Sequence, residues 1–190
     1  VLALLERLKD DPSLYVRRSV ANSLNDIGKD HPALLVETSK RWMRDATEER
    51  RWIIRHALRS AVKRGDSGAL GLLGFGEAPR VSLERVRITP RRPAIGSAVT
   101  LTFDIAGRAV RAQRLLVDLR VHYVKAHGAT GPKVFKLKAV DLAPRGVVPF
   151  SKRLSLAQLT TRTHYPGRHA VEVLINGQAY PLGTFELTDR

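Results

Sequence analysis

Four polar residues recur at helical spacing in the stretch YVRRSVANSLNDIGKDHP, which begins at Tyr15. On an α-helix, which turns by about 100° per residue, they share one narrow band opposite the apolar side chains: Arg18, Asn22, Asn25 and Lys29. Cations and amides hold phosphates and read base edges. Because Asn is a poor helix former and no acid lies in the centre of the band, we interpret it as a binding surface. An ordinary solvated face is the alternative.

A second band of the same kind lies 37 residues further along, in RWIIRHALRSAVKR. Its members are Trp52, His56, Arg59 and Lys63, with Arg55 at the edge. Each helix also has a predicted apolar face, made of Val16, Val20, Leu24 and Ile27 in the first and of Ile54, Ala57, Leu58 and Ala61 in the second. If the two helices pack side by side, one surface presents cations, amides and an indole.

The elements that carry these bands are helical, because apolar residues recur every three or four positions up to about Phe75. We predict a first helix at LALLERL and a second that starts at Asp11–Pro12 and stops at Gly28. A third helix runs from Pro32 through ALLVETSKRWMRD, and a fourth runs from a cap at Thr47 or Asp45 to Gly65. A short fifth helix is predicted in SGALGLLG. The 37-residue offset between similar aromatic–apolar–Arg segments indicates HEAT-type repeats.

From about Val81 the apolar residues alternate, which is typical of strands. Seven runs are predicted, near residues 81–88, 97–106, 113–124, 133–142, 147–155, 168–175 and 179–187. The Asn-Gly pair in LINGQAY favours a type I′ hairpin turn. The predicted fold class is therefore multi-domain α + β: an all-α HEAT-like solenoid fragment over residues 1–76, then an immunoglobulin-like β-sandwich over residues 77–190, divided at GLLGFGEAPR.

The charge is strongly positive, with a formal net value of +15. Residues 77–190 hold 19 Lys and Arg against 8 Asp and Glu, a difference of +11, whereas residues 1–76 hold 14 against 10, a difference of +4. Such an excess indicates a polyanion partner, with an anionic membrane or plain solubility as alternatives. Candidate phosphate contacts in the second half are Arg91, Arg92, Arg108, Arg111, Lys133, Lys136 and Lys138.

Several classes of site are excluded or disfavoured. The chain has no cysteine, so it has no disulfide and no thiolate metal site, and no apolar run approaches the roughly 20 residues that cross a bilayer. The histidines show no ligand spacing, and His164 and His169, beside a Pro-Gly turn, are predicted to be surface residues. We expect no metal, no cofactor, no membrane partner, a cytoplasmic location and a monomer. Because VLALLERLKDD starts in a helical pattern, we expect a longer protein upstream.

The blocks RRSVANSLNDIGKDHP and RWIIRHALR are more specific than a general helical-repeat pattern. They resemble HEAT-repeat DNA glycosylases of the AlkC type, over roughly residues 1–76. Some members of that family carry an immunoglobulin-like domain after the solenoid, which the second half would match. The resemblance implies a hydrolase for DNA alkylation damage that cuts the N-glycosidic bond of N3-alkylated adenine, with no metal or cofactor.

The resemblance also implies site residues. Its blocks contain Arg17, together with the members of both polar bands. Asp26 is the only carboxylate beside the first band, and it becomes the candidate catalytic acid, which would stabilise positive charge on the sugar. Pairing with an arginine, or capping of the turn at Gly28, is the alternative for Asp26.

Three functions stay open at this point. The first is DNA repair by a glycosylase acting on alkylated double-stranded DNA, with the sandwich helping to hold the duplex. The second is DNA binding without catalysis, and the third is a scaffold for an acidic protein partner. The charge of the second half favours the first two, because a protein scaffold would not explain it.

Overall fold

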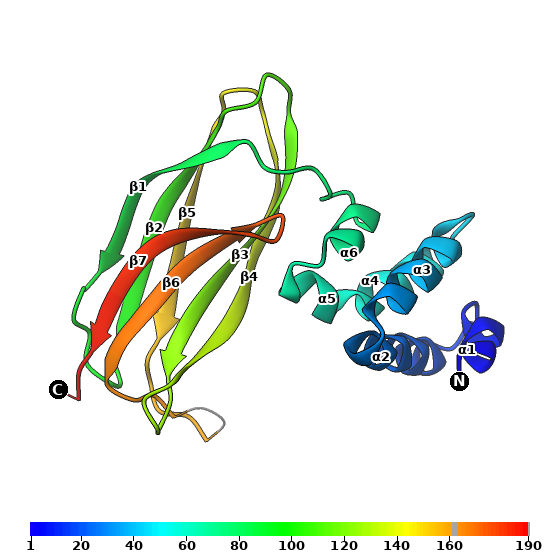
Figure 1. The fold of residues 1–190 in the computed structure, drawn as a ribbon, viewed down its shortest axis with the longest axis horizontal. Helices are drawn as coiled ribbons and strands as arrows, with labels where there is room; N and C mark the ends of the chain where they lie inside the picture. The colour runs from blue at the N-terminus through cyan, green and yellow to red at the C-terminus, as the bar shows by residue number, and fades with distance from the viewer. Residues whose placement is uncertain (161–162, 190) are drawn as a thin grey trace. The chain divides into compact units, whose positions relative to one another are not determined.

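The computed structural model describes residues 1–160 and 163–189. Its contacts divide the chain into two compact units, Val1–Glu77 and Ala78–Arg190, the first helical and the second built from strands (Figure 1). No helix in these described ranges is long and apolar enough to cross a membrane.

The helical unit has six helices within the described residues, and they begin and end at local signals. They are α1 (Leu2–Leu8), α2 (Leu14–Asp30), α3 (Pro32–Met43), α4 (Glu48–Ala57), α5 (Arg59–Arg64) and α6 (Ser67–Leu72). As predicted, Pro32 opens α3, and the Thr47 hydroxyl caps α4 by accepting a hydrogen bond from the Arg50 amide at 3.2 Å. Gly65 ends α5 in the left-handed region, at φ 81°.

Both predicted ends of α2 are wrong. The helix begins after Ser13 and not at Pro12, because the Asp11 carboxylate accepts a hydrogen bond from the Ser13 amide at 2.8 Å in a turn before the helix. It also continues through Gly28 to Asp30. Gly28 is a packing position: a Cβ there would lie 2.3 Å from Leu35 Cδ2 of α3. The glycine thus permits close approach of two helices and does not stop the first.

The predicted fold class is wrong, because residues 1–160 and 163–189 contain no long HEAT-like solenoid segment. Its helices are few and mostly short, α5 and α6 having 6 residues each, and strands account for more of the described residues than helices do. The predicted continuous helix over RRWIIRHALRSAVKR is also interrupted at Leu58, between α4 and α5. Spacing in threes and fours identified helices correctly, but it did not determine how they stack.

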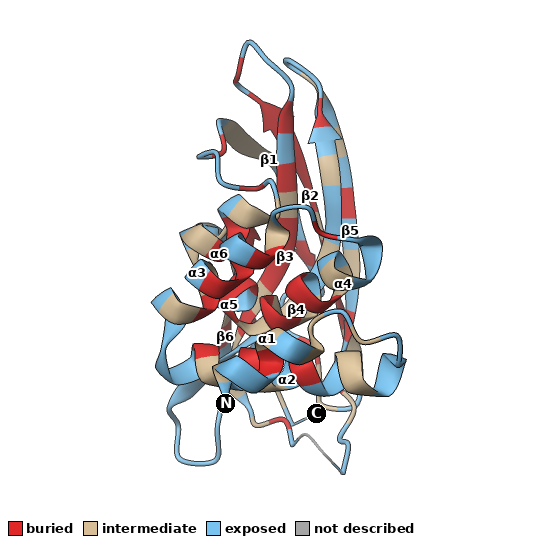
Figure 2. Cartoon of the chain, turned by 90° about the vertical axis from the view of Figure 1, so that its right-hand side faces the viewer, coloured by how far each residue is buried: buried red, intermediate tan, exposed pale blue. Residues whose placement is uncertain are grey.

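The buried face of α2 is turned relative to the prediction. Val20 and Leu24 are buried as expected, but Val16 and Ile27 are only half-buried. Ala21, Asn25 and Gly28 are buried in their place, since α2 packs against both α3 and α4. In the second helical segment all four predicted core residues are fully buried: Ile54, Ala57, Leu58 and Ala61. Figure 2 shows buried segments of α4 and α5 in red.

The second unit has seven strands within the described residues, and they lie where the alternation predicted them. They are β1 (Val81–Thr89), β2 (Ala98–Gly107), β3 (Gln113–Val124), β4 (Thr130–Leu142), β5 (Val147–Ser155), β6 (Gly167–Ile175) and β7 (Gln178–Leu187). All pairings are antiparallel, in a three-stranded sheet β1-β2-β5 and a four-stranded sheet β4-β3-β6-β7. Asn176 and Gly177 both have positive φ, 47° and 79°, which confirms the predicted hairpin turn.

The core lies between the two sheets and uses the inward-facing residues of each strand. On β3 they are Leu115, Val117, Leu119 and Val121, all fully buried. Facing residues from the other sheet include Phe103 on β2 and Phe150 on β5, whose rings stack with centroids 5.1 Å apart. Two β-sheets packed face to face in this way expose four edge strands, which are β1, β5, β4 and β7.

The prediction that His164 and His169 are surface residues is wrong. His169 is fully buried, and His164 is 3% exposed. His169 precedes Val171 and Val173 at two-residue intervals, so it occupies a core-facing position of β6, and its ring stacks on Phe185 at 4.9 Å. The alternation along β6 indicates that His169 faces the core, but the adjacent Pro-Gly turn led to the prediction of a surface position.

Candidate functional site

The two predicted polar bands meet at one amide. Asn22 on α2 accepts a hydrogen bond through Oδ1 from Arg59 Nη2 at 3.0 Å, and the same oxygen lies 3.2 Å from His56 Nε2. Asn22 is thereby held by one residue of α4 and one of α5. Since an amide oxygen has two acceptor positions, these two contacts use its full capacity and fix its orientation.

An aromatic platform extends this cluster along α4. The rings of Trp52 and His56 stack with centroids 5.0 Å apart and planes inclined by 6°. The two residues lie four positions apart, which places them on the same face of one helix. Both are half-buried, so part of the stacked surface remains open to solvent. The platform is flat and aromatic, and it lies beside amide and guanidinium groups.

The interruption at Leu58 positions the guanidinium of Arg59. Arg59 is the first residue of α5, and its Nη1 donates a hydrogen bond to the carbonyl oxygen of His56 at 2.6 Å. The last carbonyls of a helix lack partners within that helix. Arg59 donates a hydrogen bond to one of these carbonyls, that of His56, while its other terminal nitrogen binds Asn22. The break in the predicted helix therefore places Arg59 where it can make both hydrogen bonds.

Asp26 lies one turn after Asn22 and is exposed. Lys29 Nζ lies 2.7 Å from its Oδ1, with side-chain exposures of 57% for Lys29 and 62% for Asp26. The hydrogen bond from Lys29 is the largest cause that lowers the pKa of the Asp26 carboxyl, and hydrogen bonding from Asn25 and the charge of Arg59 act in the same direction. The carboxylate is therefore ionised at neutral pH and lies close to the cluster around Asn22.

Asn25 departs from its predicted place in the exposed band. It is 3% exposed, and its Oδ1 is buried without a hydrogen-bond partner among the described residues. The reason is the turned face of α2, which brings Asn25 toward the packed side of the helix. Arg18, Asn22 and Lys29 keep the exposed positions that the spacing predicted.

The remaining predicted cations are spread around the cluster. Arg17 is half-buried, and its charge helps to lower the pKa of Glu49. Arg55 lies 3.7 Å from the Glu48 carboxylate on the same helix. Arg18 and Lys63 are exposed, and no ion pair with either is found within residues 1–160 and 163–189. Among the described residues, contacts or charge bring the following predicted site residues together: Asn22, Asn25, Asp26, Lys29, Trp52, His56 and Arg59.

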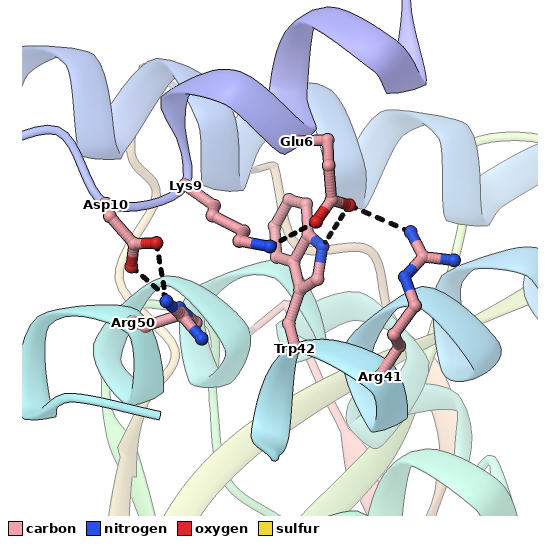
Figure 3. A network of polar contacts seen from close by, with 6 residues as sticks. All are labelled: Glu6, Lys9, Asp10, Arg41, Trp42 and Arg50. Atoms are coloured by element: carbon pink, nitrogen blue, oxygen red, sulfur yellow. Dashed lines mark hydrogen bonds and ion pairs between the residues drawn. The ribbon is translucent and has the colours of Figure 1, made fainter. Parts of the chain in front are cut away.

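A carboxylate network that the sequence did not indicate joins α1 to α3 in the helical unit (Figure 3). Glu6 of α1 accepts hydrogen bonds from Trp42 Nε1 at 2.7 Å and Arg41 Nη2 at 2.9 Å, and it also contacts Lys9. The hydrogen bond from Lys9 is the first cause that lowers the pKa of Glu6, to about 2. Because Trp42 is 36 residues away and buried, no local motif could have predicted the contact.

Beside this network, Asp10 and Arg50 form a two-pronged pair. Arg50 Nε lies 2.7 Å from Asp10 Oδ1, and its Nη2 lies 2.5 Å from Oδ2 (Figure 3). Parallel hydrogen bonds of this kind are directional and well suited to arginine. Together, the two networks fasten the segment from α1 to the turn after it onto α3 and α4.

No metal-binding group emerges from the part of the chain that the structure describes. Within it, no three His, Asp or Glu side chains lie close enough together to hold a metal ion. The chemistry available at the Asn22 cluster therefore consists of hydrogen bonding, stacking, positive charge and one ionised carboxylate.

The predicted phosphate contacts of the sandwich differ in their surroundings. Arg91 donates to the carbonyl oxygen of Thr184 at 3.1 Å, and Arg108 pairs with Glu84 at 2.9 Å. Lys138 lies with its Nζ 4.8 Å from the centroid of the Phe150 ring. The others are exposed: Arg92, Arg111, Lys133 and Lys136.

Comparison with known proteins relates both halves to one group. Residues 82–189 match the family described as the C-terminal Ig-like domain of the uncharacterised protein YhaZ. YhaZ of Bacillus subtilis (strain 168) is 39% identical over 178 residues, which cover 94% of this chain and 49% of YhaZ. The chain thus spans about half the length of the curated relative it matches.

A solved structure resembles nearly the whole chain. It is the alkylpurine DNA glycosylase AlkC of Pseudomonas fluorescens, bound to DNA containing an abasic site analog. The TM-score is 0.92 at 42% identity, over 98% of this chain and 52% of that protein. The chain therefore has an AlkC-like fold, in both the helical unit and the Ig-like unit.

Proposed function

Since the chain belongs to the family defined by the C-terminal Ig-like domain of YhaZ, we propose that it acts in DNA repair as part of a DNA glycosylase. The observation that carries the proposal is the AlkC-like fold, at 42% identity over 98% of the chain. The proposed substrate is double-stranded DNA that carries N3-alkylated adenine or a similar cationic alkylpurine. The proposed reaction is hydrolysis of the N-glycosidic bond, which leaves an abasic site.

The cluster around Asn22 is the proposed DNA-binding surface of the helical unit. Arg59 and Lys29 contribute positive charge near phosphates, while Asn22 is held in one orientation by two neighbours. Arg18 and Lys63, exposed and without ion pairs among the described residues, are available for further phosphate contacts. In the basic sandwich, Lys and Arg exceed Asp and Glu by 11, and this excess of positive charge would strengthen the attraction of DNA to the protein.

The Trp52–His56 platform would lie against the sugar or base at the lesion. Its two parallel aromatic rings stack on each other, and both residues are only half-buried. Aromatic rings stack on bases without regard to sequence, which suits an enzyme that must find damage anywhere in DNA. The hydrogen bond between His56 and Asn22 would keep the platform in place.

Asp26 is the proposed catalytic carboxylate. When the C1′–N bond breaks, its electron pair neutralises the cationic base, and positive charge appears on the sugar. An ionised carboxylate stabilises that charge, and water then adds to C1′ and releases a proton. The lowered pKa keeps Asp26 ionised, and bound DNA would exclude the water that now surrounds it. Such exclusion strengthens the electrostatic interaction.

DNA binding without catalysis is a second candidate, and one observation favours it. Asp26 is paired with Lys29 at 2.7 Å, and this pairing reduces the negative charge that a developing sugar cation would meet. In that case the cluster would hold DNA while no carboxylate of this chain takes part in bond cleavage.

The proposal is tested by incubating the complete gene product with methylated duplex DNA and quantifying released bases by chromatography. We expect release of 3-methyladenine from methylated duplex and none from an unmethylated duplex of the same sequence. Binding of both duplexes without release of any base would support the second candidate and contradict the glycosylase. Absence of DNA binding would contradict both.

A further inference from the structure

A hollow lined by lysines lies between two edge strands of the sandwich. Strand β4 is the edge of the four-stranded sheet, and β5 is the edge of the three-stranded sheet. The residues that line the hollow come only from these two strands: Lys136, Leu137, Lys138, Pro149, Phe150, Ser151 and Lys152. Three of the seven carry a positive charge, and none is acidic.

Two of these lysines occupy core-facing positions. Lys138 pairs in register with Val117, and Lys152 pairs with Leu101; both partners are fully buried in the core. Cross-strand partners project from the same face of a sheet. Lys138 and Lys152 therefore start from the inner faces of the two sheets, and the length of a lysine side chain allows its ammonium group to stay in contact with water.

Phe150 lines the hollow, and its ring contacts one ammonium group. Its ring is 7% exposed, and Lys138 Nζ lies 4.8 Å from the ring centroid. A cation over an aromatic face is attracted by the ring, so this ammonium has a preferred place even without a ligand. The Ser151 hydroxyl, on the same strand as Phe150, is a neutral donor at the rim.

No carboxylate lines the hollow among the described residues. In the ranges 1–160 and 163–189, none of Lys136, Lys138 and Lys152 forms an ion pair with an acid. Asp104 lines a neighbouring hollow that shares Phe150, but Arg85 binds it. Three like charges around one depression repel one another, and an anion in the depression would relieve that repulsion.

We propose that this hollow binds a phosphate group of a nucleic-acid backbone. The inference deepens the proposed function, on which it rests for the identity of the partner, by assigning one phosphate-binding site in the sandwich. Lysines bind phosphate as point charges, and the open mouth between two edge strands admits a phosphate that belongs to a polymer. Notably, only two of the seven cations singled out from the sequence, Lys136 and Lys138, line the hollow, and Lys152 was not among them.

Edge strands also use lysines for another purpose, which is to prevent pairing with strands of other molecules. Protection of an edge strand requires lysines at the same positions as phosphate binding does, but the two roles predict different effects when the lysines are removed. Lysines that only protect an edge would not change the salt dependence of DNA binding, and their removal would cause self-association.

The test compares two triple variants of the 190-residue chain that lose the same charge. In the first, the hollow is neutralised by Lys136→Gln, Lys138→Gln and Lys152→Gln. In the matched control, exposed cations elsewhere on the sandwich are neutralised by Lys125→Gln, Arg153→Gln and Arg168→Gln. Duplex binding is measured across a salt series, with melting temperature and light scattering to verify folding and monodispersity.

We expect the hollow variant to reduce the slope of log K against log salt by about 1, the value for one lost phosphate contact, while the control keeps the wild-type slope. Equal changes in both variants would show a general charge effect and overturn the proposal. An unchanged slope together with self-association of the hollow variant would overturn it in favour of edge protection. If the triple variant does not fold, Lys138→Gln against Lys125→Gln makes the same comparison.

Failure of the proposed function would look different. If the wild-type chain binds no DNA, the proposed nucleic-acid partner is wrong. Titration with inorganic pyrophosphate, followed by NMR of the lysine side chains, then tests whether the hollow binds an anion. Shifts of Lys138 and Lys152 with pyrophosphate but no DNA binding would overturn the nucleic-acid assignment while locating an anion site. Shifts with both ligands, abolished in the hollow variant, are the expected result.

Discussion

Arg59 Nη2 donates a hydrogen bond to Asn22 Oδ1 at 3.0 Å and thereby joins two helical segments that are 37 residues apart in the sequence. The same guanidinium holds the carbonyl oxygen of His56, whose ring lies on Trp52. One arginine thus joins the Asn22 amide to the backbone of the helix that carries the stacked His56 and Trp52 rings, on a surface that also carries an ionised Asp26.

Arg18→Ala should weaken DNA binding with little effect on stability. The side chain is exposed and has no ion pair among the described residues, so the free energy of unfolding should change by less than about 0.5 kcal/mol. If Arg18 contacts one phosphate, the slope of log K against log salt should fall by about 0.9. Thermal melting and a salt series of binding isotherms measure the two effects.

Val20→Asp provides the contrasting change on the same helix. Val20 is 1% exposed, and an unpaired carboxylate there should destabilise the protein by more than about 3 kcal/mol. Comparable melting temperatures for Val20→Asp and Arg18→Ala would contradict the assignment of the two faces of α2.

Asp26→Asn should slow base release without a comparable loss of DNA binding. The variant removes the negative charge proposed to stabilise the sugar cation, and loss of one such group lowers the rate by about 100-fold or more. A single-turnover assay on methylated DNA measures it in the complete gene product. Asp30→Asn, an exposed carboxylate on the same helix, is the control and should release base at the wild-type rate. Wild-type release by Asp26→Asn would remove this residue from the mechanism.

Glu6→Gln should destabilise the helical unit at neutral pH by about 1 kcal/mol, a small value because the carboxylate is partly exposed. The pKa of Glu6 is lowered from 4.5 to about 2, so its ionised form stabilises the folded state fully above pH 4.5. That contribution is lost as the pH falls through about 2. The difference between wild type and Glu6→Gln in urea unfolding should therefore shrink from pH 5 to pH 2, whereas exposed Glu37→Gln should show no such trend.

His169 should make the sandwich sensitive to mild acid. Burial lowers its pKa below 6.5, and its neutral ring accepts from the Val124 amide at 3.3 Å and donates to the Tyr165 carbonyl at 3.2 Å. The resulting stability is present above pH 6.5 and is lost as the pH falls through the lower folded value. Melting temperatures of wild type should therefore decline below pH 6.5 more steeply than those of His169→Gln. A control change at exposed His127 should leave the wild-type profile intact.

Gly28→Ala should destabilise the packing of α2 on α3. The added Cβ would lie 2.3 Å from Leu35 Cδ2 and 2.9 Å from Leu35 Cβ, which requires a shift and costs about 1–3 kcal/mol. Gly71→Ala on α6 is the matched control, because beyond its own helix the nearest described atom to its Cβ would be Gly76 Cα, at 4.0 Å. Alanine should be neutral or stabilising there by up to about 1 kcal/mol. Urea unfolding curves distinguish the two positions.

Local signals were sufficient for many elements. Alternation located all seven strands, Asn176–Gly177 determined its turn, and Thr47 and Gly65 marked a helix start and a helix end. These features depend on neighbouring residues alone: φ preferences, a hydroxyl within reach of a nearby amide, and side chains that alternate between two faces. The same patterns could not show that the predicted HEAT-like solenoid is absent, because they describe single helices and not how helices stack.

Residue types and spacing also selected Asn22, Trp52, His56 and Arg59 as members of one surface, and their contacts in the structure agree with that selection. Whether they act on DNA stays a prediction. Asn25 shows where spacing fails: it shares the helical band with Asn22, but two packing neighbours turn the buried side of α2 toward it.

Contacts between segments that are distant in the sequence could not be predicted from local sequence patterns. Glu6 reaches Trp42 across 36 residues, and Lys138 reaches the ring of Phe150 from another sheet. Periodicity along the chain tells which side of an element is apolar, because that property repeats with the geometry of the element itself. Which partners meet a side chain depends on how separate elements pack, and that packing is determined by shape and burial summed over the whole unit.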